Sequence, residues 1–346
     1  MGELSDCYTN VTLYGASHGK SLPTDEEDKS EGRTTRGPNM LKVALLGCGR
    51  WGHNHLRVLA SFRERGIIGY ITVIDTSKSA REAATLADET KPDFDDVDAD
   101  LVIIATPSNL HASQARELLS KGYHVLVEKP LGCSESEAAQ VLANAREFGR
   151  ILGVGLLLRF HPAVTLANRM INSGELGRIE SLRFVRRTTR NAPENGNVIE
   201  ALGVHAIDLM CHFMSESEPS AVHVQGDKIE ARIALEFPHG IEAIIDVGWQ
   251  TTRERRTVTL VGSNASLRFD LDVHDRVALI SGNDETEIFC DSTTSPLESE
   301  LQHFISGIEK FNSGQAWTPT PDYGAALRGV RWTERAIQAL PISRPH

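Results

Sequence analysis

The sequence lacks the features that mark several large classes of protein. Its five cysteines form no C-x-x-C pair, and an odd, scattered set argues against a disulfide framework and a structural zinc site. No run of about 18 apolar residues could span a membrane, and the first residues lack the basic-then-apolar order of a secretory signal. We therefore expect a soluble, cytoplasmic protein with reduced thiols and no metal.

Positive charge is also scarce. The 346 residues include 36 Lys and Arg against 47 Asp and Glu, a formal net charge of -11. Proteins that bind nucleic acids or anionic membranes need a concentrated basic face, so we expect neither partner.

One local exception is a predicted strand that carries four arginines. Strand alternation places Arg183 and Arg187 on one face and Arg186 and Arg190 on the other. The simple interpretation is a solvated strand. The alternative is a clamp for an anionic substrate such as a nucleotide-sugar diphosphate, which at most one pair could form.

A chain of this length predicts two domains. Residues 1–38 are polar and read as a mobile extension. Within it, residues 15–21 (GASHGKS) imitate a phosphate-binding loop, but the glycine spacing is one residue short and no helix follows. We expect a dinucleotide-binding domain over residues 39–157. A substrate and oligomerisation domain should follow over residues 158–346, with the last helix packing back on the first domain.

In the first domain, short β-branched runs alternate with helical patterns. The expected strands are 43–46, 71–74, 101–104, 125–127 and 151–154, and the expected helices are 54–65, 79–88, 113–121 and 135–148. This alternation is typical of right-handed βαβ units around a parallel sheet. It predicts an α/β Rossmann domain.

After Leu158 the pattern changes to helices followed by longer alternating strands. The expected helices are 162–172, 201–214, 297–311 and 323–340, and the strands include 179–188, 221–226, 231–237, 242–250 and 257–261. This order predicts an α+β domain with a large, mostly antiparallel open sheet covered by helices on one face.

A dinucleotide fingerprint follows the first expected strand. Gly47, Gly49 and Gly52 form G-x-G-x-x-G around Arg50 and Trp51. In this pattern the first glycine allows a tight turn, the second admits the pyrophosphate and the third permits close packing of helix on strand. The helix N-terminus then offers unpaired N–H donors to the phosphates.

The second strand ends in Asp75, where a carboxylate can accept hydrogen bonds from both ribose hydroxyls of an adenosine. Because an aspartate repels a 2′-phosphate, we expect NAD as the cofactor, and NADP less so. Lys78 lies close enough to weaken this preference.

Two later loops complete the expected cofactor site. Thr106, Pro107, Ser108 and His111 follow the fourth strand, where such a turn lines the nicotinamide half of the cleft. The fifth strand ends in Glu128 and Lys129. Ligands bind outside the carboxyl ends of parallel strands, so Lys129 should touch cofactor and substrate rather than solvent.

Several short motifs resemble, in their order, the glucose-fructose oxidoreductase and inositol dehydrogenase family. They are the glycine fingerprint, TPSNLH at 106–111, EKP at 128–130, RFHP at 159–162, GELG at 174–177 and GVHAID at 203–208. The resemblance implies NAD(P)-dependent oxidation or reduction of a sugar, cyclitol or nucleotide sugar, with Arg159 and Asp208 near the substrate. It also implies a homo-oligomer, a dimer or tetramer, formed through the C-terminal sheet.

Hydride transfer from a carbinol carbon needs a base and a cation that stabilises the developing alkoxide. Lys129 and His205 match these needs as catalytic residues, Lys129 holding the reacting oxygen and His205 shuttling the proton. His53 and His55 are not a metal pair, because they are two apart at a helix start.

The sequence departs from the family at Ala201, where relatives frequently carry an aspartate four residues before the histidine. The neighbouring Glu200 would lie about 100° around a regular helix, so it can substitute only if the backbone there is irregular. Two alternatives therefore stay open. One is a non-catalytic dinucleotide-binding regulator, and the other is an NAD-retaining, redox-neutral glycosidase.

Overall fold

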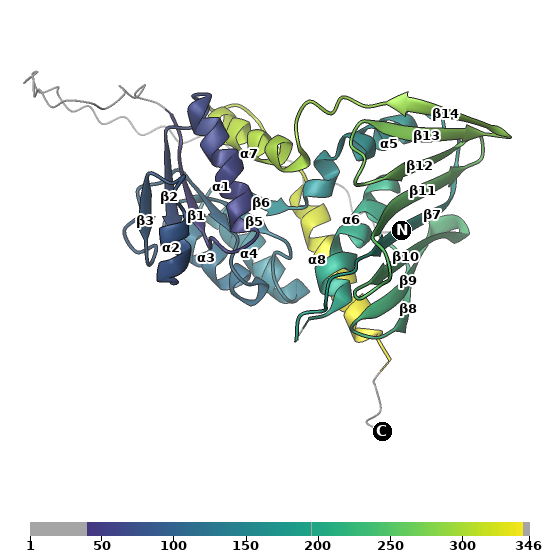
Figure 1. The fold of residues 1–346 in the computed structure, drawn as a ribbon, viewed down its shortest axis with the longest axis horizontal. Helices are drawn as coiled ribbons and strands as arrows, with labels where there is room; N and C mark the ends of the chain where they lie inside the picture. Colours follow the sequence, from purple (N-terminus) through teal and green to yellow (C-terminus); the bar gives the residue numbers. More distant parts are fainter. Residues whose placement is uncertain (1–39, 195, 342–346) are drawn as a thin grey trace, which may run out of the picture. The chain divides into compact units, whose positions relative to one another are not determined.

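The computed structural model describes residues 40–194 and 196–341. The predicted extension, with its imitation of a phosphate-binding loop, lies outside them. The first sheet has six parallel strands in the order β3-β2-β1-β4-β5-β6 (Figure 1). Its strands are β1 (Lys42–Leu46), β2 (Tyr70–Ile74), β3 (Glu89–Lys91), β4 (Leu101–Ile104), β5 (His124–Glu128) and β6 (Leu152–Gly155).

Helices cover both faces of this sheet. They are α1 (Gly52–Glu64), α2 (Lys78–Ala83), α3 (His111–Ser120) and α4 (Glu135–Glu147). The hydroxyl oxygens of Ser77 and Ser134 accept hydrogen bonds from the first turns of α2 and α4, which satisfies amides that have no partner in the helix. Helix α2 buries no side chain and ends at Ala83, earlier than predicted.

The second sheet has eight strands in the order β14-β13-β12-β11-β7-β10-β9-β8. Its strands are β7 (Ile179–Arg187), β8 (Ala221–Gly226), β9 (Glu230–Phe237), β10 (Ile241–Gly248), β11 (Arg255–Gly262), β12 (Ser266–Asp270), β13 (Arg276–Ser281) and β14 (Asp284–Phe289). All neighbouring pairs are antiparallel except β7 with β10. The alternating burial along β9 shows that one face meets the core and the other meets solvent.

Helices pack on one face of this second sheet, and the opposite face is open in Figure 1. The helical elements that follow the first domain are η2 (Leu157–Phe160), α5 (Pro162–Asn172), the π-helix η3 (Ile199–Gly203), α6 (Val204–Phe213), η4 (Pro238–Gly240), α7 (Pro296–Asn312) and α8 (Tyr323–Gln338). The predicted fold class, a Rossmann domain joined to an α+β domain, is confirmed. Its boundaries at residues 38 and 157 stay predictions.

Two late helices join the core of the first domain. Leu301 and Phe304 of α7 lie in the same hydrophobic cluster as β1 and α1. Helix α8 contributes Val330 to the cluster on the other face of that sheet and Trp332 to the core of the second sheet. No helix among the described residues is long and apolar enough to cross a membrane.

Candidate active site

The glycine-rich turn has the shape that its pattern predicts. Gly47 has φ +93, and a Cβ there would lie 2.8 Å from the backbone of Ala105. A Cβ on Gly52 would lie 2.2 Å from the carbonyl oxygen of Gly47, so the helix can approach the turn this closely only because residue 52 is glycine. A Cβ on Gly49 would meet nothing within 4 Å, which leaves that side of the turn open to a ligand.

Asp75 fixes this turn from the end of β2. One carboxylate oxygen accepts a hydrogen bond of 2.8 Å from the amide of Cys48, and the other accepts one of 2.8 Å from the amide of Ser77. The amides of Gly49 and Arg50 donate to no other group in the described part of the chain. Free amides at a helix N-terminus suit phosphates, and a carboxylate beside them suits ribose hydroxyls. These residues therefore fit a dinucleotide.

Glu128 lies beneath the turn and is 6% exposed. The indole N–H of Trp51 donates to its Oε1 atom, and Nε2 of His55 lies 2.8 Å from the same oxygen. Burial alone would raise the pKa of Glu128, but the hydrogen bonds from His55 and Trp51 outweigh it and hold the pKa below its usual range. Glu128 is thus an ionised anchor for helix α1 rather than an exposed ligand group.

Glu300 of α7 is a second, fully buried carboxyl in this region. Neither of its oxygens has a hydrogen-bond partner among the described residues. Burial, and then the charge of Glu128, raise its pKa well above the usual value, so Glu300 is neutral.

The loop after β4 connects the first domain to the site. Both ring nitrogens of His111 lie near carbonyl oxygens, Nδ1 at 2.8 Å from Pro130 and Nε2 at 2.9 Å from Thr106. Thr106 donates its hydroxyl to Gln114, and Ser108 donates its hydroxyl to Glu200 at 2.9 Å. His111 therefore holds two loops together from a buried position, while Ser108 reaches across to the second domain.

Lys129 directly follows Glu128, the last residue of β5, and is half-buried. Its Nζ donates to the carbonyl oxygen of Ala201 at 2.9 Å. Burial lowers the pKa of Lys129 to about 8. The charges of Glu128 and, more weakly, Glu200 raise this pKa, and the charge of Arg186 lowers it. The side chain therefore titrates near physiological pH instead of staying permanently charged.

The backbone that meets Lys129 is the π-helix η3. Asn197 accepts the amide of Ile199 at its start, and the wider turn brings the Ala201 carbonyl to Lys129 and the Glu200 carboxylate to Ser108. The condition under which Glu200 could replace an aspartate at position 201, an irregular backbone, is met. Sequence reasoning left Glu200 out of the site because it expected a regular helix around residues 201–214, in which Glu200 would point away from the position of the aspartate.

His205 lies in the next turn and is 6% exposed. Its Nδ1 is buried without a hydrogen-bond partner in the described residues, so it is not bonded to Asp208. Burial, then the charges of Lys129, Arg186 and Arg256, lower its pKa well below the usual value. The imidazole is therefore neutral in the resting protein.

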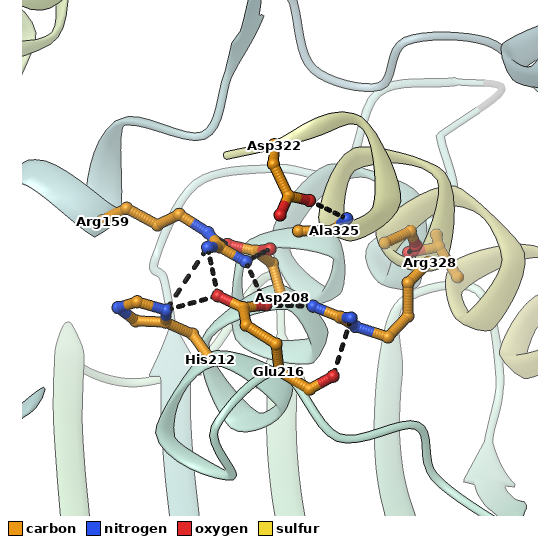
Figure 2. A network of polar contacts seen from close by, with 9 residues as sticks. Arg159, Asp208, His212, Glu216, Asp322, Ala325 and Arg328 are labelled. Carbon is orange, nitrogen blue, oxygen red and sulfur yellow. Dashed lines mark hydrogen bonds and ion pairs between the residues drawn. The ribbon is translucent and has the colours of Figure 1, made fainter. Parts of the chain in front are cut away.

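Arg159 and Asp208 form the centre of a buried polar network (Figure 2). Two guanidinium nitrogens of Arg159 donate to the two oxygens of Asp208 at 2.8 and 2.6 Å. Arg159 also donates to Glu216 at 2.7 Å, and Arg328 binds Glu216 from the other side. Burial opposes the charge of Arg159, but Asp208 outweighs it and raises the pKa further.

The predicted substrate residues are thus bound to each other. The Nε, Nη1 and Nη2 atoms of Arg159 all donate hydrogen bonds to protein carboxylates. The side chain therefore supports the site from within the protein. Substrate contact by Arg159 or Asp208 stays a prediction.

Comparison with known proteins places this architecture in a class. A model of an oxidoreductase family with an NAD-binding Rossmann fold matches residues 41–156, and a model of the GFO/IDH/MocA C-terminal domain matches residues 164–268. Fold and matches together define a two-domain protein with a nicotinamide dinucleotide site. The chain belongs to the GFO/IDH/MocA oxidoreductase family, as its motifs predict.

Curated relatives are distant. Inositol 2-dehydrogenase 2 of Saccharopolyspora erythraea is 27% identical over 177 residues, which cover 49% of this chain and 52% of that protein. The chain thus matches about half the length of this relative. Inositol 2-dehydrogenase of Rhizobium meliloti is 22% identical over 332 residues, covering 88% of this chain and 98% of that protein.

Solved structures share the fold. Levoglucosan dehydrogenase in complex with NADH and levoglucosan gives a TM-score of 0.75 at 18% identity, covering 86% of this chain and 96% of that one. A 3-ketoreductase from Actinomadura kijaniata in complex with TDP-benzene and NADP gives 0.76 at 18% identity, covering 87% and 98%. At these identities the likeness establishes the fold alone.

Proposed function

We propose that this protein is an NAD(P)-dependent dehydrogenase that transfers a hydride between nicotinamide and a CH–OH carbon of a sugar, cyclitol or nucleotide sugar. The observation that carries the proposal is the placement of Lys129. Its amine, with a pKa lowered to about 8 by burial, lies at the carboxyl end of β5 beside a neutral His205. Family membership and the names of the relatives support the reaction class.

The residues that would hold the dinucleotide are the turn from Gly47 to Gly52, including Arg50 and Trp51, together with Asp75 and the loop of Thr106, Pro107 and Ser108. Glu128 and His111 would act from beneath, by fixing α1 and the two loops. When bound, the nicotinamide supplies the hydride acceptor.

In the proposed reaction the protein accepts the hydroxyl proton and stabilises the negative charge that develops on the oxygen. One donor of the Lys129 ammonium is used on Ala201, which leaves two for the reacting oxygen. As the carbinol C–H is lost as hydride, the O–H proton passes to His205 and Lys129 stabilises the developing alkoxide. Glu200 orients this centre through Ser108 and through its charge on Lys129.

Loss of Lys129 tests this proposal. Lys129→Ala should lower kcat/KM by about 1,000-fold, within the range of a general acid–base residue, while NADH binding survives. The control is Lys121→Ala, since Lys121 is an exposed lysine paired with Glu117. Turnover at the wild-type rate in Lys129→Ala would overturn the mechanism. Tight nucleotide binding without NADH formation on any sugar would favour a non-catalytic regulator. Cleavage of a glycoside without net NADH formation would favour a glycosidase.

We further propose NAD rather than NADP as the preferred cofactor, because the Asp75 carboxylate, beside the glycine-rich turn, would repel a 2′-phosphate. Fluorescence titration of the wild type should give a lower Kd for NADH than for NADPH. Asp75→Asn should narrow this difference, whereas Asp96→Asn, at an exposed loop, should not. A lower Kd for NADPH in the wild type would refute the preference.

We also propose that the open face of the second sheet mediates a homodimer or tetramer. This face carries Arg183 and Arg232, both paired to the buried Asp246. Sedimentation velocity should show a species larger than one chain, and a monomer at micromolar concentration would contradict this.

A further inference from the structure

Two arginines face each other across neighbouring strands at the edge of the site. Arg186 of β7 is in register with Arg256 of β11. Phe184 and Val258, the next pair on the same face, are fully buried, so both arginines point toward the helix-covered side. Like charges directly opposite each other in a sheet are destabilising. The pair therefore needs negative charge nearby.

The protein supplies only part of that charge. Arg256 donates to Asp272 at 3.0 Å. On the opposite face, Arg183 pairs with Asp246 and Arg187 pairs with Glu230.

Arg186 differs from these neighbours. Its Nε is buried without a hydrogen-bond partner among the described residues. Burial, and then the charges of Arg256 and Arg190, lower its pKa to about 10, although the more weakly acting charges of Asp272 and Glu254 oppose this. Arg186 is half-buried, and charged groups withdrawn from water are ordinarily paired, so its Nε is a donor available to a partner outside the described residues.

This donor faces the reacting centre. The charge of Arg186 acts on both Lys129 and His205, and that of Arg256 also acts on His205. Arg190 lies just beyond the end of the same strand, with its Nε 3.2 Å from the hydroxyl of Thr188. Of the three arginines in β7, only Arg186 therefore faces the site, and Arg190 is close enough for its charge to act on Arg186.

We infer that the substrate carries an anionic group, a carboxylate or a phosphoryl group, close to its reacting carbinol carbon, and that Arg186 binds this group with help from Arg190 and Arg256. The inference rests on the proposed dehydrogenase function and narrows its substrate class to sugar acids, phosphorylated sugars or nucleotide sugars. A guanidinium suits either group, because its donor fork matches two oxygens at once.

Thermal unfolding of the NADH-loaded protein tests the anion site without depending on sugar stereochemistry. Inorganic phosphate and malonate would each be compared with sodium chloride at equal ionic strength, and bound NADH keeps phosphate out of the glycine-rich turn. At least one of the two anions should raise the Tm of the wild type. A response to malonate indicates a carboxylate, and a response to phosphate indicates a phosphoryl group. No response to either would overturn the inference.

Matched variants on the two faces of one strand give the control. Arg186→Gln should lose the anion response, and Arg183→Gln should keep it. Without anions, Arg186→Gln should unfold at or above the wild-type Tm, because a half-buried cation with an unpaired Nε is gone. An arginine that served only structure would lower the Tm, and this result, or an unchanged anion response in Arg186→Gln, would overturn the inference.

Substrate comparison separates this inference from the proposed function. NADH formation from D-glucuronate or D-glucose 6-phosphate should exceed that from D-glucose by about 10-fold or more in kcat/KM, the value of a charged hydrogen bond. If only neutral sugars are oxidised, the inference of an anionic substrate is refuted and the proposed dehydrogenase function stands. If anions bind at Arg186 but no compound is oxidised, the anion site stands and the proposed dehydrogenase function is refuted.

Discussion

The side-chain amine of Lys129 lies 2.9 Å from the main-chain carbonyl oxygen of Ala201. The position where the family resemblance leads one to expect an aspartate thus contributes its backbone to the site. The π-helix makes this possible, and the same widened turn places Glu200 against Ser108. This change in backbone geometry brings the neighbouring carboxylate, and not the side chain of residue 201, to the loop after β4.

Replacement of Glu200 should therefore affect chemistry rather than folding. Glu200→Gln should lower kcat/KM by about 10-fold, the cost of one charged hydrogen bond. It should also lower the pKa of Lys129, because the charge of Glu200 raises that pKa. The measurement is the pH dependence of kcat/KM, with Glu147→Gln on the exposed side of α4 as the control. A profile that does not move would show that Glu200 has no electrostatic role.

The charge of Lys129 should set the alkaline limit of the reaction. Because its pKa is lowered to about 8, the ammonium that stabilises the alkoxide is present below this value and is lost as pH rises through it. We expect kcat/KM for alcohol oxidation to fall above about pH 8. Lys129→Arg stays charged over this range, so its residual activity should lack this decline. An identical decline in that variant would assign the titration to another group.

Loss of Arg159 from its buried network should strongly destabilise the protein. Arg159→Met leaves Asp208 buried without its partner, which costs about 3–5 kcal/mol. Urea unfolding would measure this loss, with Arg178→Met as the control because the Arg178 side chain is 78% exposed. The double variant Arg159→Met, Asp208→Leu should recover part of the loss. A loss of under about 1 kcal/mol in the single variant would show that water reaches Asp208.

Glu300 should make stability depend on pH. Its pKa in the folded protein is raised by burial and by Glu128, so its contribution is complete below the unfolded pKa and declines as pH rises through the folded pKa. Glu300→Gln removes this decline. Its Tm should exceed that of the wild type more at about pH 8 than at about pH 5. Glu309→Gln, exposed on the same helix, should show no such difference.

The parts of the fold that sequence predicts well are those specified locally. The parallel strands are short apolar runs between helices, and the glycine turn before α1 is a contiguous pattern. Strand β3 was missed because its residues, Glu89 to Lys91, are polar and mostly exposed. Strand β14 was missed for the same reason, since five of its six residues are exposed.

The site was predictable where one residue follows a strand and less so where two distant segments meet. Lys129 and the glycine turn belong to the first kind. The pairing of Arg186 with Arg256 depends on the register of strands that are 70 positions apart in the chain, which no local pattern encodes. The π-helix around Glu200 was hidden because its residues also fit an ordinary helix.

Helix α7 has a consequence for how the chain reaches its native state. A Cβ on Gly153 would lie only 2.2 Å from the ring of Phe304, so this ring packs directly against the glycine. Phe304 and Leu301 belong to a helix near the end of the chain, yet they fill the core of the first domain. During synthesis from the N-terminus, a domain ordinarily folds as soon as it has emerged. Here the core of the first domain is complete only after α7 has been synthesised. Residues 40–157 expressed alone should therefore expose an apolar surface and aggregate.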